Sequence, residues 1–162
     1  MADMLVKLYE LPAAEPILGG LREEGIDIRR ALAPEMHIVV EWVRRTFGPG
    51  WASECQVGFA NQPVSCFIAT EDGRPVGFGC YDATCKDFFG PTGVAEEKRK
   101  KGIGKGLLLA CLHGMRAEGY GYAIIGGAGP ADFYAKAAGA VVIEGSQPGI
   151  YRGMLSGEER AE

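Results

Sequence analysis

The feature that most constrains the fold of this chain is a glycine-spaced basic segment at residues 94–108, which reads VAEEKRKKGIGKGLL. An apolar run ends at Val94, and apolar residues at helical spacing begin near Leu108. The free amides and the dipole of a helix's first turn attract anions. Gly102, Gly104 and Gly106 would let phosphate oxygens approach the backbone without a Cβ in the way. Positive charge surrounds this point on Lys98, Arg99, Lys100, Lys101 and Lys105. The segment therefore predicts a phosphate-binding turn that opens into a helix, rather than a solvated basic turn.

Two common phosphate-binding loops do not fit this segment. A Walker A loop needs GxxxxGK[ST], but Arg99 stands at its first glycine and Gly106 at its Ser/Thr. A dinucleotide fingerprint needs GxGxxG and an acidic residue after the next strand, whereas that strand runs into Gly126 and Gly127. ATP, GTP and dinucleotides are therefore disfavoured as ligands.

Length and composition indicate one globular domain. The chain has 162 residues, 47% of them hydrophobic and 23% charged, which is enough to bury a core. Its formal net charge of -4 argues against bulk nucleic-acid binding. No apolar run approaches the roughly 20 residues that cross a bilayer, and no signal peptide is visible. We expect a cytoplasmic protein with no membrane partner, an N-terminal extension over residues 1–25 and one domain over residues 26–156.

The five cysteines do not predict a metal centre. They occur without a CxxC pair, and the two histidines, His37 and His113, lie far apart in sequence. We expect no metal, and most of the thiols should be small buried hydrophobes.

The order of predicted elements indicates a mixed α/β fold. Strand patterns cover residues 4–9, 26–31, 64–70, 75–81, 87–94, 120–125, 140–144 and 150–154. Helical patterns cover residues 17–24, 34–47, 51–59, 103–119 and 132–138. Antiparallel hairpins come first and a strand-helix-strand crossover follows, which is typical of a mixed sheet with helices on its faces. Gly90, Pro91 and Gly93 predict a bulge, or the end of regular pairing, within the fifth strand.

Two short motifs resemble the GCN5-related N-acetyltransferase (GNAT) superfamily. Residues 99–104 match its acetyl-CoA-binding pattern [RQ]xxGx[GA], and Val94 stands where the family has a strand-end valine. Phe133-Tyr134-Ala135-Lys136 resembles its second signature, on a short helix before a glycine. A helix and a strand separate the motifs, as that fold requires, and the resemblance spans residues 26–154.

The resemblance implies a fold and a reaction. The fold is a mostly antiparallel sheet in which two central strands splay apart to form a wedge for acetyl-CoA. The reaction is direct attack of a primary amine on the thioester in a ternary complex, without an acyl-enzyme. The implied general acid is Tyr134, and a backbone amide near Val94 would bond the acetyl carbonyl. The implied cofactor-binding residues are Val94, Arg99, Lys100, Lys101, Gly102, Ile103, Gly104 and Lys105.

Several features remain open at this stage. Gly127 and Pro130 replace residues common in the family, so the loop 126–130 must have its own geometry. No general base is identified: Glu96 and Glu97 are more typical of a charged helix start, and Glu54, Asp82 and Asp87 are weaker candidates. Trp51 and Phe89 are candidates for an acceptor site. The acceptor could be a small-molecule or peptide amine, and residues 1–25 are a candidate dimerisation element that would make a homodimer. A non-catalytic acyl-CoA sensor is the alternative function.

Overall fold

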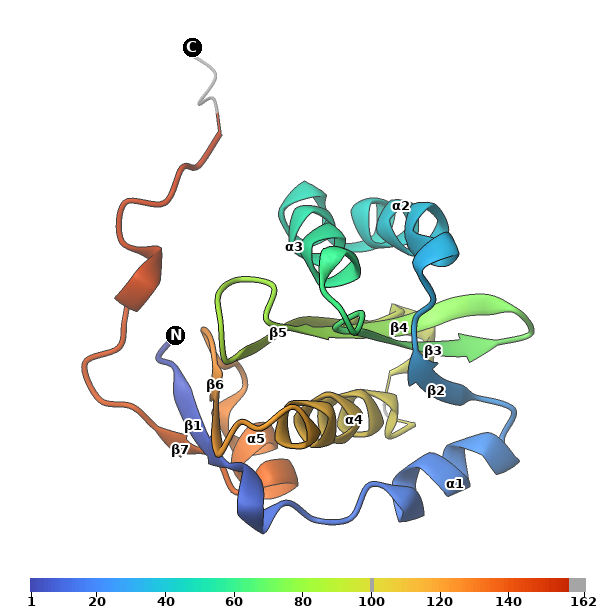
Figure 1. Ribbon diagram of the computed structural model, residues 1–162, viewed down its shortest axis with the longest axis horizontal. Coiled ribbons are helices and arrows are strands. Elements are labelled where there is room, and N and C mark those ends of the chain that lie inside the picture. Colours follow the sequence, from blue (N-terminus) through green and yellow to red (C-terminus); the bar gives the residue numbers. More distant parts are fainter. Residues whose placement is uncertain (100, 158–162) are drawn as a thin grey trace.

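The computed structural model describes residues 1–99 and 101–157, which form one sheet between two layers of helices (Figure 1). The strands are β1 (Met4–Lys7), β2 (Asp27–Arg30), β3 (Cys66–Glu71), β4 (Arg74–Tyr81), β5 (Phe88–Val94), β6 (Tyr122–Ile125) and β7 (Val141–Val142). The helices are α1 (Glu15–Glu23), α2 (Met36–Phe47), α3 (Pro49–Ala60), α4 (Ile103–Ala117) and α5 (Ala131–Ala138). This order agrees with the sequence-based expectation as far as β7.

The sheet has the order β2-β3-β4-β5-β6-β1-β7, and only the β5–β6 pair is parallel. Helices α2 and α3 pack on one face, where a core cluster includes Val43, Phe59 and Phe78. Helices α1, α4 and α5 cover the other face, and α4 contributes to both core clusters there. The expected mixed, mostly antiparallel sheet with helices on both faces is therefore confirmed. Within residues 1–99 and 101–157, no helix has the length and apolar character needed to cross a bilayer.

The first 25 residues supply a strand of this sheet and a helix against it. Strand β1 lies between β6 and β7 and pairs antiparallel with both, with Met4 opposite Ile125 and Val142. Its alternate residues Met4 and Val6 are buried, as is Leu8 just after it. The period-2 pattern at the N-terminus thus corresponds to a strand with one face in the core.

The C-terminal segment does not form the second strand expected at residues 150–154. Gly149–Tyr151 is a single 3₁₀ turn, and residues 152–157 contain no helix or strand. The hairpin expected between residues 140–144 and 150–154 does not form: the first of these segments is reduced to the two residues of β7, which pair with β1 instead. Gly149 and Gly153, which both have positive φ, further disfavour an extended run.

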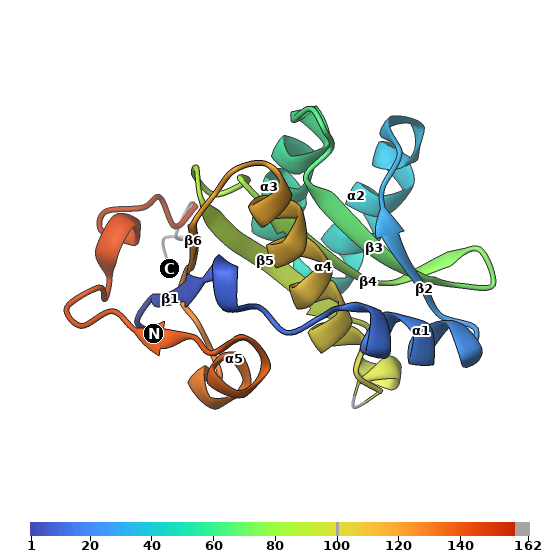
Figure 2. The ribbon, with the colours of Figure 1, turned by 60° about the horizontal axis from the view of Figure 1, so that its bottom comes forward.

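A β-bulge and an early end to pairing separate β5 from β6. Along β4 the step from Gly79 to Tyr81 covers two residues, whereas their partners on β5, Thr92 and Phe89, are three apart. The extra residue falls at Gly90–Pro91, as the sequence predicts. On its other edge β5 pairs with β6 only at Phe88 and Phe89, after which the two strands diverge (Figure 2). The splayed strand pair is therefore present.

Because Leu8 is fully buried directly after β1, Leu8→Ala should lower the free energy of unfolding by about 2–5 kcal/mol. Lys7→Ala, at an exposed neighbouring position, should change it by less than about 0.5 kcal/mol. Urea denaturation of the two variants checks this. Equal stability of both would show that burial of Leu8, in the turn after β1, contributes little to the folded state.

Candidate active site

Beyond Phe89, one edge of β5 has no neighbouring strand among the described residues. The Ala95 amide donates to the Val76 carbonyl, so this amide points toward β4. Amides alternate in direction along an antiparallel strand, and the Val94 and Thr92 amides therefore point the other way, toward the gap. The Val94 carbonyl on that side accepts a bond of 3.3 Å from Arg99 Nε, whereas the Val94 amide stays available. This edge offers backbone donors to an extended ligand.

The three alternating glycines have different roles at the start of α4. Gly102 is the N-cap with φ +87, a conformation that favours glycine, and a Cβ there would lie 2.9 Å from Ile17. A Cβ on Gly106 would lie 2.6 Å from Ile28 Cδ1, so this glycine allows β2 and α1 to pack on the helix. Only Gly104 has room, because its nearest neighbours, Val94 and Phe133, would be 3.9 and 4.0 Å away. Gly104 is thus the glycine whose open side faces the end of β5.

The first turn of α4 also provides free amides. The first helical bond there runs from the Gly106 amide to the Gly102 carbonyl at 2.9 Å, so the amides of Ile103, Gly104 and Lys105 have no acceptor within the helix. The side chain of Ile103 is fully buried in the core, which fixes the position of this turn. Together with the helix dipole, these amides form an anion site.

The basic side chains of this segment are not equivalent. Lys98 lies 2.5 Å from Glu71, so its charge is compensated by the β3–β4 hairpin. Arg99, Lys101 and Lys105 are exposed around the start of α4. Lys100, which the sequence also places at this site, lies outside the described residues.

The contrast between two of these glycines can be tested by alanine substitution. Both Gly104→Ala and Gly106→Ala gain helix propensity, but only the methyl group added by Gly106→Ala would overlap buried side chains. We expect Gly106→Ala to be less stable than Gly104→Ala by about 1–3 kcal/mol in chemical denaturation. Equal stabilities would mean that α1 and β2 shift to make room for the added methyl group with no loss in the free energy of unfolding.

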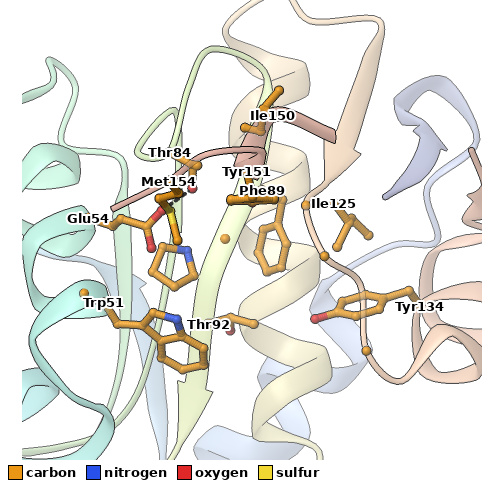
Figure 3. Close-up of a pocket in the computed structure, with 16 residues that line it drawn as sticks. Trp51, Glu54, Thr84, Phe89, Thr92, Ile125, Tyr134, Ile150, Tyr151 and Met154 are labelled. Carbon is orange, nitrogen blue, oxygen red and sulfur yellow. Dashed lines mark hydrogen bonds between the residues drawn. The ribbon is translucent and has the colours of Figure 1, made fainter. Parts of the chain in front are cut away.

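The second motif, residues 133–136, lies next to the first motif, residues 99–104. Tyr134 on α5 is 7% exposed and lines a pocket of about 620 Å³, with its hydroxyl pointing into it (Figure 3). Its neighbour Phe133 packs edge-on against it at 5.0 Å and also faces Gly104. Burial raises the pKa of Tyr134 above the ordinary phenol value, which keeps the hydroxyl protonated at neutral pH. This is the state that a proton donor requires.

The same pocket extends from the gap between β5 and β6 to helix α3. On the gap side it is lined by Phe89, Gly90, Pro91, Thr92, Ile125, Gly126, Gly127, Gly129 and Tyr134. On the α3 side it is lined by Gly50, Trp51, Glu54, Thr84, Ile150, Tyr151 and Met154. Trp51 and Phe89, the two aromatic candidates from the sequence, both line this pocket, Trp51 on the α3 side and Phe89 on the gap side.

Sequence reasoning missed the C-terminal wall of the pocket. Ile150, Tyr151 and Met154 were expected on a strand, and instead they border the pocket from a 3₁₀ turn and the segment after it. A Cβ on Gly126 would lie 2.5 Å from the Tyr151 hydroxyl, so this glycine allows the turn to approach β6. The paired glycines after β6 were a signal of close backbone approach.

The five candidate carboxylates differ in whether they line the pocket. Glu96 and Glu97 are exposed on the turn after β5 and do not line the pocket. Asp82 accepts hydrogen bonds from Tyr120 and the Asp87 amide. Burial and the Asp82 charge raise the pKa of Asp87 to about 6. Of the five carboxylates, only Glu54 lines the pocket, and the Thr84 hydroxyl donates a hydrogen bond to it.

Three thiols lie together away from the pocket. The sulfur atoms of Cys55, Cys66 and Cys80 are within 4.8 Å of one another, in the core between α3 and the sheet. Hydrogen bonds from Cys66 and Cys80 lower the pKa of Cys55 to about 5, whereas hydrogen bonding to Cys55, together with burial, raises the pKa of Cys66 and of Cys80. All three side chains are buried and pack among apolar neighbours.

Comparison with known families identifies the fold. A sequence model of the acetyltransferase (GNAT) family matches residues 36–139, which include both motifs and the strands on either side of the gap. The chain belongs to the GNAT acetyltransferase family. The resemblance carried by residues 99–104 and 133–136 is therefore confirmed, and no curated protein matches the chain.

Solved structures of GNAT proteins share this fold at low sequence identity. A glucosamine N-acetyltransferase region of a fungal multi-domain GH3 β-N-acetylglucosaminidase has a TM-score of 0.71 at 18% identity, over 88% of this chain and 19% of that one. A GCN5-related N-acetyltransferase from Sphaerobacter thermophilus has a TM-score of 0.64 at 24% identity, over 88% and 48%. One from Kribbella flavida has a TM-score of 0.57 at 17% identity, over 87% and 53%. The chain thus spans about half or less of each of these proteins.

Proposed function

We propose that this GNAT protein transfers an acetyl group from acetyl-CoA to a primary amine by direct attack in a ternary complex. The observation that carries the proposal is the gap between β5 and β6, which opens directly after Phe89 and contains the free edge of β5. An extended pantetheine arm can add to that edge as a further strand would. The anion site at the start of α4 lies at the far end of the same edge, where the diphosphate would bind.

The proposed roles follow from these positions. The amides of Ile103, Gly104 and Lys105 bond the diphosphate, and Arg99 and Lys101 add positive charge beside it. An outward amide of β5, at Val94 or Thr92, donates to the acetyl carbonyl and stabilises the oxyanion that forms on attack. The residues present therefore suit a CoA thioester.

Proton transfer balances in this scheme. The acceptor ammonium loses one proton to solvent, and the neutral amine forms a C–N bond with the acetyl carbon. As the C–S bond breaks, the Tyr134 hydroxyl gives its proton to the departing thiolate. The Tyr134 phenolate then recovers a proton from the amide nitrogen through water. The products are the acetylated amine and free CoA.

The test measures free CoA by chromatography after acetyl-CoA is incubated with a panel of primary amines. We expect amine-dependent CoA release and intersecting double-reciprocal plots, because both substrates must be bound together. Calorimetry measures acetyl-CoA binding in parallel. Binding without CoA release for any amine would reject the transferase and favour an acyl-CoA sensor.

A further inference from the structure

The α3 side of the pocket contains a single charged group. Among the described residues that line the pocket, Glu54 is the only one with an ionisable acidic or basic chain of the Asp, Glu, Lys, Arg or His type. No Lys or Arg in the described part of the chain is within ion-pair distance of it. The Thr84 hydroxyl donates a hydrogen bond to the Glu54 carboxylate. The pKa of Tyr151 is raised, first by burial of its hydroxyl and then by the negative charge of Glu54. The local field is therefore negative.

Apart from the hydroxyls of Thr84 and Tyr151, the rest of this wall is apolar or aromatic. Trp51 is 39% exposed, and Ile150 and Met154 are exposed to 53% and 70%. These side chains border the pocket around Glu54, with Tyr151 behind them (Figure 3). Apolar side chains exposed in a pocket gain stability when a ligand's own apolar surface covers them.

The pocket has two opposite sides, and an acceptor would bind between them. Glu54 and Trp51 come from α3, whereas Tyr134 comes from α5, with Thr92 of β5 between them (Figure 3). With a thioester along β5, an acceptor amine between these walls would have Glu54 on one side and the reacting carbonyl on the other. The charge and surface of the α3 side therefore select the acceptor.

We propose that the acceptor is a primary amine on an aromatic or aliphatic body that carries no anionic group, a claim that rests on the proposed function. Glu54 binds the ammonium group and is the specificity-determining residue, while Trp51, Ile150 and Met154 cover the body. A carboxylate or phosphate on the acceptor would face the Glu54 charge without a cationic partner in the described lining. A polyhydroxylated body, such as that of an amino sugar, would place hydroxyls against Ile150 and Met154, whose apolar side chains leave them unpaired.

The first experiment uses probes that differ in one feature. Phenethylamine and L-phenylalanine share the ring and the amine, and only phenylalanine has a carboxylate; glucosamine has a polar body. We expect kcat/KM for phenethylamine to exceed that for each of the others by at least about 100-fold. Calorimetric titration of each probe into the protein–CoA complex should give the same order of affinity.

The second experiment removes the charge and keeps the shape. Glu54→Gln still offers an oxygen to the Thr84 hydroxyl. We expect it to raise the KM for phenethylamine by at least about tenfold and leave the affinity for CoA unchanged. Glu41→Gln, an exposed position on α2, is the matched control and should behave as the wild type.

The outcomes separate the two claims. If amines are acetylated, but phenylalanine or glucosamine is used as well as phenethylamine or Glu54→Gln has no effect, the acceptor class is wrong and the transferase stands. If no amine is acetylated, the transferase fails. The calorimetric order of the three probes then decides the binding claim by itself, and equal or reversed affinities overturn it.

Discussion

Replacing Tyr134 by phenylalanine should lower kcat by about 100-fold or more and leave acetyl-CoA affinity unchanged. The substitution removes only the hydroxyl that points into the pocket, and the ring contacts with Phe89 and Phe133 remain. Because the hydroxyl donates to the departing thiolate, its loss affects the chemical step rather than binding. Single-turnover CoA release measures that step, and calorimetry measures binding.

Tyr122→Phe is the matched control, since this tyrosine is 47% exposed on β6 and does not line the pocket. Its turnover should equal that of the wild type. A Tyr134→Phe protein with normal kcat would remove the tyrosine from the mechanism.

The raised pKa of Tyr134 adds a prediction about pH. A general acid is active while protonated, and burial raises the pKa of Tyr134 above its ordinary value near 10. The wild-type kcat should therefore show no loss with rising pH from about 7 to 10. A fall in kcat within that interval, with binding intact, would indicate a different proton donor.

Gly104→Asp should weaken CoA binding by about 100-fold or more, because a carboxylate would lie beside the diphosphate. The protein should still fold, since a Cβ at this position meets no atom closer than 3.9 Å. Calorimetric titration with CoA, alongside circular dichroism of the variant, checks both statements.

Two control variants show whether the loss of CoA affinity comes from the added charge and from this position. Gly104→Ala should lose much less affinity than Gly104→Asp, because it adds no charge. Glu97→Ala, on the exposed turn before α4, should bind CoA as tightly as the wild type. Normal CoA affinity in a folded Gly104→Asp protein would show that the diphosphate binds elsewhere.

Local sequence patterns predicted the part of the fold that depends on neighbouring residues. The helical spacing of Leu108, Cys111, Leu112 and Met115 corresponds to the buried face of α4. Gly90 and Pro91 predicted the bulge in β5 because neither residue supports regular pairing at that point. These signals act within a few residues along the chain.

The parts that failed depend on long-range partners. Nothing local to residues 140–144 indicates that they pair with β1, so the sequence predicts a hairpin with residues 150–154 that does not form. The three glycines of the α4 turn look alike in the sequence. The positive φ of Gly102, and the packing of Ile17 on Gly102 and of Ile28 on Gly106, distinguish these two glycines from Gly104. Glu54 could not be ranked above other carboxylates, because its place in the pocket depends on α3 packing against the sheet.

The position of β1 also has a consequence for how the chain folds during synthesis. Met4 pairs with Ile125, so β1 leaves the ribosome well before its partner strand β6 has been made. At about 5–20 residues per second this delay lasts several seconds or more, during which the apolar residues of β1 have no native partner. Such a long sequence separation between contacts favours slow folding, and a ribosome-associated chaperone that shields β1 during synthesis should raise the yield of folded protein.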